Sequence, residues 1–453
     1  MSTARELLDA VLDPGSFESW DQPAAHDADY LRRAAERAGT DEAVLTGRGL
    51  VQGRAVAVLV SEFAFLAGSI GMVAAARITS AVRRATAERL PIVASTASGG
   101  TRMQEGAPAF VEMINISKAL MEHKAAGLPY LVHLRHPTTG GVFASWGSLG
   151  HVTVAEPGAL IGFLGPKVYE AMEGIPFPPD VQTAENLAAH GVIDGVVDTA
   201  DLPFLLDRTL GVLVDPPVPP TLPRRTGVVG RVDAWESVLQ TRRSDRAGVQ
   251  DLLRYGATGT VRLTEPDASV LVALTRLDGQ PCVVVGQDRS QARSMGPAAL
   301  RAARRGMNLA QALGVPLVTV IDTAGAELSP AAEEGGLAGE IAQCIATMAT
   351  ITVPTLSVLL GQGTGGGALA LLPATTVLAT EHAWLAPLPP EGASAIMHRD
   401  ITHAAEMAAA QHITATELHA AGTIHHLIPE QDSDTPESLA IAVAAECAAR
   451  LSQ

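Results

Sequence analysis

Two glycine pairs stand where the chain turns from an apolar strand into an apolar helix. Gly140 and Gly141 follow one such strand, and Gly365 and Gly366 follow another. Glycine inside a helix or strand is about 0.5–1 kcal/mol less favourable than alanine, so a structural or functional reason is expected for each pair. Without Cβ atoms, backbone N–H groups at a helix start can approach a ligand oxygen and stabilise its negative charge. We therefore predict two oxyanion-binding turns. The alternative is packing so close that only glycine fits.

A second candidate is the segment "SGGTRMQEG" over 98–106. It combines a flexible loop at Ser98, Gly99 and Gly100 with a fixed cation at Arg102, and a helix follows. This arrangement suits a phosphate or carboxylate ligand. The alternative is that Arg102 pairs with Glu105 or with another acid of the chain.

Both glycine pairs belong to a longer internal repeat. Aligning the sequence with itself at an offset of 225 brings together similar apolar runs without a gap over nearly ninety residues. The matched positions include Pro91 with Pro316, Pro129 with Pro354, Gly140 and Gly141 with Gly365 and Gly366, and Glu156 with Glu381. The two halves are therefore interpreted as copies of one ancestral domain.

Each copy predicts buried strands that alternate with helices, which is typical of parallel sheets in α/β proteins. The predicted strands are 92–96 and 129–134 in the first copy, and 317–321 and 354–360 in the second; the long helices are 108–124 and 337–350. The stiff segment "DPPVPPTLPRR" over 215–225 predicts a boundary, giving domains 1–225 and 226–453. Residues 235–255 predict one helix leading into the second copy.

Composition excludes several classes of protein. The formal net charge of −16 argues against nucleic-acid and membrane-surface binding. Three widely spaced cysteines without a C-x-x-C motif argue against disulfides and zinc ribbons, and the charged N-terminus lacks a signal-peptide pattern, so we expect a cytoplasmic protein. The uncharged stretch 341–379 is interpreted as buried strand, turn and helix, because prolines and glycines interrupt it.

One pattern resembles a dinucleotide site. Gly361, Gly363 and Gly366 match G-x-G-x-x-G after a strand, and Glu381 lies twenty residues after the first of them. However, the motif usually follows the first strand of its domain, and the first copy has no equivalent pattern. A nicotinamide-dependent oxidoreductase is therefore a minor alternative.

The longest motifs resemble a known family. "ASGGTRMQEG" and "LRHPTTGGVFASWGSLGHVTVAEPGALIGFLGP" closely resemble the beta subunit of bacterial acetyl-CoA carboxylase carboxyltransferase. "GQGTGGGALALL" and "PLPPEGASAIMHRD" resemble its alpha subunit. The chain is thus similar to a fused beta-alpha carboxyltransferase of actinobacterial type. The resemblance implies a crotonase (ClpP-like) ββα-spiral fold in each half.

The resemblance also implies a reaction. Family members transfer a carboxyl group from carboxybiotin, carried by a separate protein, to the α-carbon of an acyl-CoA such as acetyl-CoA or propionyl-CoA, giving malonyl-CoA for fatty-acid synthesis. The biotin ureido oxygen and the thioester oxygen both gain negative charge, so two oxyanion holes are expected. Carried over by motif, Gly140 and Gly141 form one hole, and Gly366 and Gly367 form the other. Ser98, Gly99, Gly100, Arg102 and Gly365 would lie along the binding side for the cofactor and CoA.

The same resemblance implies partners. No segment resembles the A-M-K-M site of biotin attachment, so we expect a separate biotin carboxylase and biotin carboxyl carrier protein. We expect a homodimer or a higher oligomer, with no nucleic-acid or membrane partner. No zinc is expected, since the four-cysteine ribbon of the beta subunit is missing. A non-catalytic paralogue that acts in assembly is the alternative.

Overall fold

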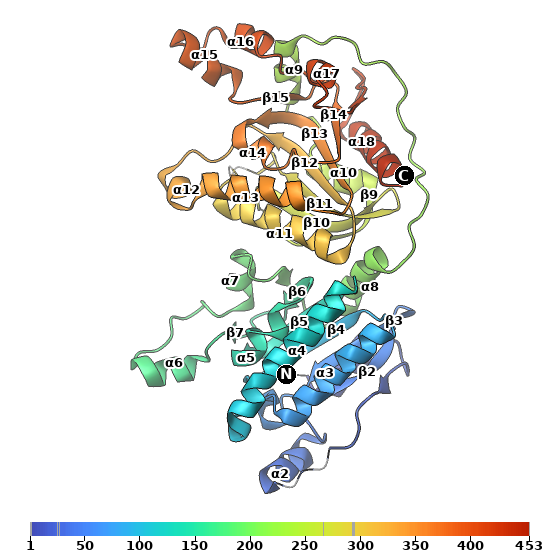
Figure 1. The fold of residues 1–453 in the computed structure, drawn as a ribbon, viewed down its shortest axis with the longest axis vertical. Coiled ribbons are helices and arrows are strands. Elements are labelled where there is room, and N and C mark those ends of the chain that lie inside the picture. Colours follow the sequence, from blue (N-terminus) through green and yellow to red (C-terminus); the bar gives the residue numbers. More distant parts are fainter. Residues whose placement is uncertain (1, 25, 27, 266, 292–294, 453) are drawn as a thin grey trace. The chain divides into compact units, whose positions relative to one another are not determined.

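The structure is a computed structural model that describes the chain except for residues 1, 25, 27, 266, 292–294 and 453. The chain divides into two compact units, Met1–Leu210 and Gly211–Gln453. Within the described residues, each unit is built on one eight-stranded sheet, and helices cover the sheet (Figure 1).

The sheet of the first unit has the order β1-β2-β3-β4-β5-β6-β8, and β7 pairs with the end of β5. The first three strands pair antiparallel, whereas the pairings from β3 onward are parallel. The strands are β1 (Glu18–Ser19), β2 (Val44–Val51), β3 (Arg54–Ser61), β4 (Ile92–Ser98), β5 (Tyr130–Thr139), β6 (Val152–Ala155), β7 (Ile161–Gly162) and β8 (Gly195–Val196).

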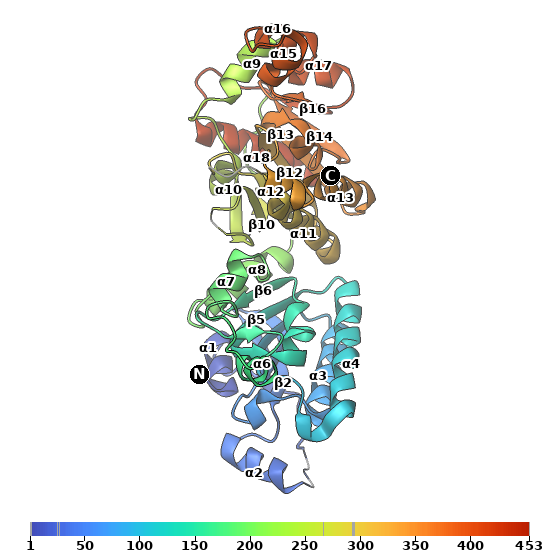
Figure 2. The ribbon, with the colours of Figure 1, turned by 90° about the vertical axis from the view of Figure 1, so that its left-hand side faces the viewer.

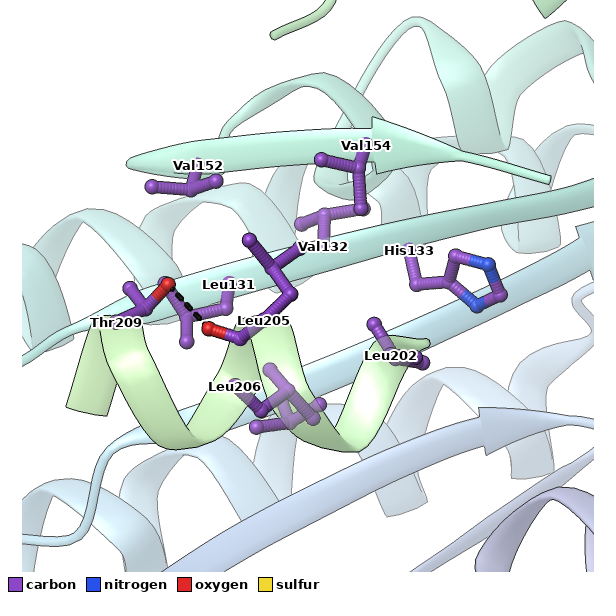
Figure 3. Close-up of a pocket in the computed structure, with 10 residues that line it drawn as sticks. Leu131, Val132, His133, Val152, Val154, Leu202, Leu205, Leu206 and Thr209 are labelled. Atoms are coloured by element: carbon purple, nitrogen blue, oxygen red, sulfur yellow. Dashed lines mark hydrogen bonds between the residues drawn. The ribbon is translucent and has the colours of Figure 1, made fainter. Parts of the chain in front are cut away.

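Two long helices, α3 and α4, lie side by side on one face of this sheet (Figures 1 and 2). They enclose the main core, in which Ile78 and Leu120 pack with Val132 and Leu134 of β5. On the other face, α8 covers Leu131 and Val154 and leaves a void of about 10 Å³ (Figure 3). The helices are α1 (Ala4–Val11), α2 (Asp29–Ala38), α3 (Met72–Ala87), α4 (Gly106–Ala125), α5 (Gly140–Phe143), α6 (Pro166–Glu173), α7 (Ala184–Ala189) and α8 (Leu202–Leu213).

The sheet of the second unit has the order β16-β14-β13-β12-β11-β10-β9, and β15 pairs with the end of β13. Again the hairpin strands pair antiparallel and the rest pair parallel. The strands are β9 (Ala257–Arg262), β10 (Val270–Leu277), β11 (Gln280–Gln287), β12 (Leu317–Thr323), β13 (Thr355–Thr364), β14 (Thr376–Thr380), β15 (Trp384–Ala386) and β16 (His426–Ile428).

In this unit α10 and α18 enclose the core, where Val249 and Leu252 pack with Val284, Val318 and Val443. Helix α11 packs against β10 and β11, and α13 packs against α11. The helices are α9 (Ala234–Thr241), α10 (Val249–Gly256), α11 (Pro297–Leu313), α12 (Pro330–Glu334), α13 (Leu337–Thr350), α14 (Gly365–Leu369), α15 (Pro390–His398), α16 (Ala404–Ala410), α17 (Ala415–Ala420) and α18 (Pro436–Leu451).

The two units repeat one chain path. Strands β4 and β12, strands β5 and β13, and helices α5 and α14 begin at positions 225 residues apart. The pairing of β7 with the end of β5 is repeated by β15 with β13. The predicted α/β class and the internal duplication are therefore confirmed.

The structure corrects one expectation about the connecting segment. Residues 235–255 form two helices, α9 and α10, and Arg246 between them pairs with Glu430, with Nη1 2.5 Å from Oε2. The proline-rich segment is bound within the second unit. Arg276 donates to the carbonyls of Asp215 and Pro216, and Arg225 pairs with Asp434. This segment therefore belongs to the compact unit that begins at Gly211.

The uncharged stretch 341–379 is divided among α13, β13, α14 and β14, as expected. Across the part of the chain that the structure describes, no helix combines the length and apolar character needed to cross a membrane.

Candidate active site: two glycine turns

The first glycine turn lies at the carboxyl end of β5, where the strand ends at Thr139 and α5 begins at Gly140. Gly140 has φ +64°, in the left-handed region that favours glycine. Its N–H donates to the carbonyl of Phe163 at 3.0 Å. N–H groups in the first turn of a helix have no intrahelical acceptor. The turn therefore leaves the N–H group of Gly141 for a ligand, because Gly141 is partly exposed whereas Val142 is fully buried.

The loop that follows β4 lies directly beside this turn, because β4 and β5 are neighbouring parallel strands. A Cβ placed on Gly100 would lie 3.4 Å from both Gly140 Cα and Gly141 N. A Cβ on Gly141 would lie 3.0 Å from Thr101 Oγ1. Backbone therefore meets backbone at Gly100, and the structure brings together the two glycine motifs that the sequence singled out separately.

Ser98, Gly99 and Gly100 all donate hydrogen bonds within the first unit. Ser98 is buried, and its hydroxyl donates to the carbonyl of Gly68 at 2.6 Å. Gly99 N–H donates to the carbonyl of Ala67 at 2.9 Å, and Gly100 N–H donates to Ser98 Oγ at 3.0 Å. Ser98 is thus a structural residue of the loop, whereas Gly99 exposes its backbone to solvent.

The carbonyls that accept hydrogen bonds from this loop belong to a turn with a strained backbone. Leu66 and Ala67 have φ values of +48° and +56°, although neither is glycine. Each residue in that region costs about 1–3 kcal/mol and persists only where the surroundings hold it, which is common at ligand-binding sites. The hydrogen bonds from Ser98 and Gly99 supply part of that support.

Arg102 does not face solvent. Its side chain is fully buried and pairs with two acids: Nη1 lies 3.2 Å from Glu42 Oε2 and 2.9 Å from Glu105 Oε1. Burial acts to lower the pKa of Arg102, but the hydrogen bond and charge of Glu42 outweigh it, so the pKa is raised. Arg102 thus pairs with acids of the chain, as in the alternative reading of the sequence, and presents no exposed atom to a ligand phosphate.

The second turn repeats the first. β13 ends at Thr364, α14 begins at Gly365, and Gly365 has φ +62°. Gly365 is therefore the counterpart of Gly140, and Gly366 of Gly141, which is the register of the self-alignment. Gly366 and Gly367, the pair expected from the resemblance, are the second and third residues of α14. Their N–H groups likewise have no intrahelical acceptor.

The glycines that resemble a dinucleotide motif lie elsewhere. Gly361 and Gly363 are inside β13 rather than in its turn. A Cβ on Gly361 would lie 2.5 Å from Asp322 Oδ1, so glycine is needed there for packing. In the dinucleotide fold these glycines would form the turn itself. The geometry does not support a nicotinamide site.

Sequence reasoning missed two buried polar residues of the second unit. Asp322 accepts from Gln362 N–H at 3.0 Å and lies 3.2 Å from Arg289 Nη1. Desolvation by burial raises the pKa of Asp322 despite that cation. Gln287 joins Asp322 to the glycine turn: its amide accepts from Asp322 N–H at 3.1 Å and donates to the Gly367 carbonyl at 2.8 Å. Each lies at or next to the end of an apolar strand, and the sequence gives no sign of these hydrogen-bond partners.

The void beneath α8 is a separate feature of the first unit. Figure 3 shows it lined by leucine and valine side chains, with His133 at one end. His133 Nδ1 lies 3.3 Å from Ser95 Oγ, and burial followed by the charge of Arg135 lowers the pKa of His133 to about 3. The void is about the size of one water molecule, so it is too small for a substrate. Within the described ranges, no cluster of three histidine, cysteine or acidic residues is placed to hold a metal ion.

Comparison with known proteins gives one family. A family model described as the carboxyl transferase domain matches residues 1–445. The chain is 58% identical to a probable biotin-dependent acyl-coenzyme A carboxylase beta3 subunit of Mycobacterium tuberculosis, with 97% of this chain and 92% of the relative covered. It is 37% identical to the acetyl-coenzyme A carboxylase carboxyl transferase subunits beta/alpha of Salinispora arenicola, with 94% of this chain and 82% of the relative covered.

Solved structures show the same fold. The transcarboxylase 12S structure, described as a hexamer assembly, superimposes with a TM-score of 0.81 and 22% identity, over 99% of this chain and 90% of that chain. A single-chain, multi-domain long-chain acyl-CoA carboxylase gives a TM-score of 0.78 and 21% identity, over 99% of this chain and 46% of that chain.

Proposed function

This chain belongs to the carboxyl transferase family, and we propose that it is the carboxyltransferase subunit of a biotin-dependent acyl-CoA carboxylase. The observation that carries the proposal is the pair of matching glycine turns, one at the carboxyl end of β5 and one at that of β13. We further propose that residues 1–225 play the beta-subunit role and residues 226–453 the alpha-subunit role.

The chemistry asked of the protein is stabilisation of charge on oxygen. In the first turn, the N–H group of Gly141 is positioned to donate to an oxygen that becomes negative, while Gly140 shapes the turn. In the second turn, Gly366 and Gly367 donate in the same way, and Gly365 shapes the turn. Each donor contributes about 2.7–4 kcal/mol to transition-state stabilisation. Since the donors are backbone groups, they are held in place before the substrate arrives.

Biotin carried by a partner protein fits this arrangement. When bound, carboxybiotin supplies an activated carboxyl group, and its ureido oxygen gains negative charge as that group leaves. A glycine turn without Cβ atoms leaves space for such an oxygen to reach the N–H groups. The loop of Ser98, Gly99 and Gly100 lies beside the first turn, and we propose that its exposed backbone at Gly99 faces the CoA thioester.

We propose a short acyl-CoA as substrate, acetyl-CoA before propionyl-CoA, and malonyl-CoA for fatty-acid synthesis as product. The support is the motif resemblance over 97–106 and 134–166 and the similarity to a relative named for acetyl-CoA. The more similar relative is named only for an acyl-CoA. A single pocket residue can change chain-length preference, so the substrate needs direct measurement.

The proposed partners are a biotin carboxylase and a biotin carboxyl carrier protein, or their fusion, in the cytoplasm. We propose at least a homodimer, because a symmetric pair would bring the first turn of one protomer to the second turn of its partner. Sedimentation that finds a fully active monomer would contradict this.

The deciding experiment measures kcat/KM for acetyl-, propionyl- and butyryl-CoA with the carboxylated carrier. Transfer to acetyl-CoA with the highest kcat/KM supports the proposal in full. A preference for a longer acyl-CoA keeps the carboxyltransferase activity and corrects the substrate. No transfer to any of them, by a folded chain that still binds its partners, would instead support a non-catalytic assembly subunit.

A further inference from the structure

The buried Arg102 joins the turn Phe65–Gly71 to the loop Ser98–Arg102. Arg102 pairs with Glu42 and Glu105, and it also donates through Nη2 to the carbonyl of Ser69 at 2.9 Å. Its guanidinium lies over the ring of Phe65, 5.2 Å from the ring centre. Arg102 and Glu42 have no exposed surface, so solvent does not screen their attraction.

Backbone hydrogen bonds carry this connection to the glycine turn. Arg102 N–H donates to the carbonyl of Ile70 at 2.9 Å, and Ile70 N–H donates to the carbonyl of Gly100 at 2.9 Å. Gly100 in turn lies beside Gly140 and Gly141, close enough that a Cβ on it would lie 3.4 Å from Gly140 Cα and Gly141 N. Displacement of the turn Phe65–Gly71 would therefore move Gly100 against the site at which an oxygen must reach Gly141 N–H.

Glu105 closes the network from the other side. Its Oε1 pairs with Arg102, and its Oε2 accepts from Met72 N–H, the first residue of α3, at 2.6 Å. A Cβ on Gly71 would lie 2.3 Å from Glu105 Oε1 and 2.6 Å from Arg102 Nη1. The start of α3 is thus packed directly on the ion pair.

The second unit keeps the backbone part of this network without the cation. The residue that matches Arg102 at the offset of 225 is Glu327, whose N–H donates to the carbonyl of Met295 at 3.1 Å. Its carboxylate accepts from Ser329 Oγ at 2.7 Å. The buried arginine is therefore specific to the first turn.

We propose that Arg102 and Glu42 are positioning residues for the first glycine turn: their ion pair holds the strained turn Phe65–Gly71, and through it Gly100, at a fixed distance from Gly141. This inference rests on the proposed carboxyltransferase function. It replaces the role in phosphate binding that the sequence suggested for Arg102. Lysine cannot substitute, because the contacts to Glu42, Glu105 and Ser69 use the planar fork of the guanidinium.

The test compares Arg102→Lys with Arg77→Lys in the full-length protein. Arg77 is a matched control: it is also buried in the first unit and holds the neighbouring Asp41 through both terminal nitrogens, at 3.0 and 2.7 Å. Its remaining hydrogen bonds go to the carbonyls of Gln22 and Val44, outside the turn. The assay is biotin-dependent decarboxylation of malonyl-CoA.

We expect Arg102→Lys to lower kcat about 10²-fold, as for a misplacement of about 1 Å, while KM for malonyl-CoA stays near the wild-type value. Arg77→Lys should keep its kcat. Amide hydrogen exchange should accelerate over 66–71 and 99–105 in Arg102→Lys only. If Arg102→Lys does not fold, Glu42→Gln takes its place with the same expected results.

A raised KM with unchanged kcat would overturn the positioning role and restore substrate binding by Arg102. Equal kcat in both variants would overturn it as well. If the wild-type protein shows no transfer or decarboxylation at all, the proposed function fails, and hydrogen exchange alone then decides the positioning role. Exchange that is unchanged in Arg102→Lys would refute that role.

Discussion

Substituting Gly141 by valine tests the first glycine turn directly. Gly141 is not in the left-handed region, so its backbone accepts an L-residue. The new Cβ would lie 3.0 Å from Thr101 Oγ1 and 3.5 Å from Met113 Cγ, and both neighbours are side-chain atoms that can shift. Crowding of this kind costs about 1–3 kcal/mol, below the total stability of about 5–15 kcal/mol of a folded domain. The variant should therefore fold.

Activity should fall much further than stability. The branched side chain stands where a ligand oxygen must approach the Gly141 N–H. Loss of one such donor costs about 2.7–4 kcal/mol in the transition state, which corresponds to a decrease of roughly 10²–10³-fold in rate. The assay is biotin-dependent decarboxylation of malonyl-CoA, which needs no carrier or carboxylase.

The control is Gly195→Val in β8 of the same unit. A Cβ on Gly195 would meet no heavy atom of the described structure within 4 Å, so kcat should be unchanged. Circular dichroism and thermal unfolding establish that both variants fold. If Gly141→Val folds and keeps near wild-type activity, the turn is not an oxyanion hole, and its glycines serve packing alone.

Further measurements test the second glycine turn, two buried histidines and the need for partner proteins. Gly366→Val should lower the rate by a similar factor, about 10²–10³-fold, since its Cβ would displace only the flexible end of Ile341, 2.8 Å away; retained activity would exclude the second turn. Burial lowers the pKa of both His133 and His151 to about 3. As the pH falls, the unfolded chain therefore binds protons at these histidines before the folded chain does. At about pH 5 each histidine should lower the free energy of unfolding by about 2 kcal/mol relative to its value above pH 6.5. Urea unfolding at about pH 5 and above about pH 6.5 measures the free energy of unfolding, and equal free energies at both would contradict this prediction. The purified chain should neither react with streptavidin nor carboxylate acyl-CoA with ATP alone, because it has no biotin-attachment segment; either activity would count against the partner assignment.

The sequence predicted the strands well where they are apolar and less well where they carry buried polar residues. Both central strands of the first unit were placed correctly, but β5 continues to Thr139 through Arg135 and Thr138. Arg135 is buried because its guanidinium donates to the carbonyls of Ser2 and Ser61. Partners that distant in the sequence cannot be inferred from local hydrophobicity.

The candidate site shows the same limit. Repetition and the missing Cβ atoms were sufficient to single out the glycine turns. The role of Arg102 was not accessible, because its main partner, Glu42, is sixty residues away and stands in no motif. The register of the second turn also required the structure, since only the backbone dihedral angle distinguishes Gly365 from the two glycines that follow it.

The use of backbone donors has a consequence for inhibition. Peptide N–H groups neither titrate nor react with electrophiles, and all three cysteines of the chain are buried. Burial raises the pKa of Cys344 to about 11 and that of Cys282 to about 12, so neither provides a thiolate at neutral pH. Covalent warheads aimed at cysteine should therefore spare this protein. An effective inhibitor would instead be a planar anion shaped like an enolate, and resistance could not arise by deleting a side chain, because the contacts belong to the main chain.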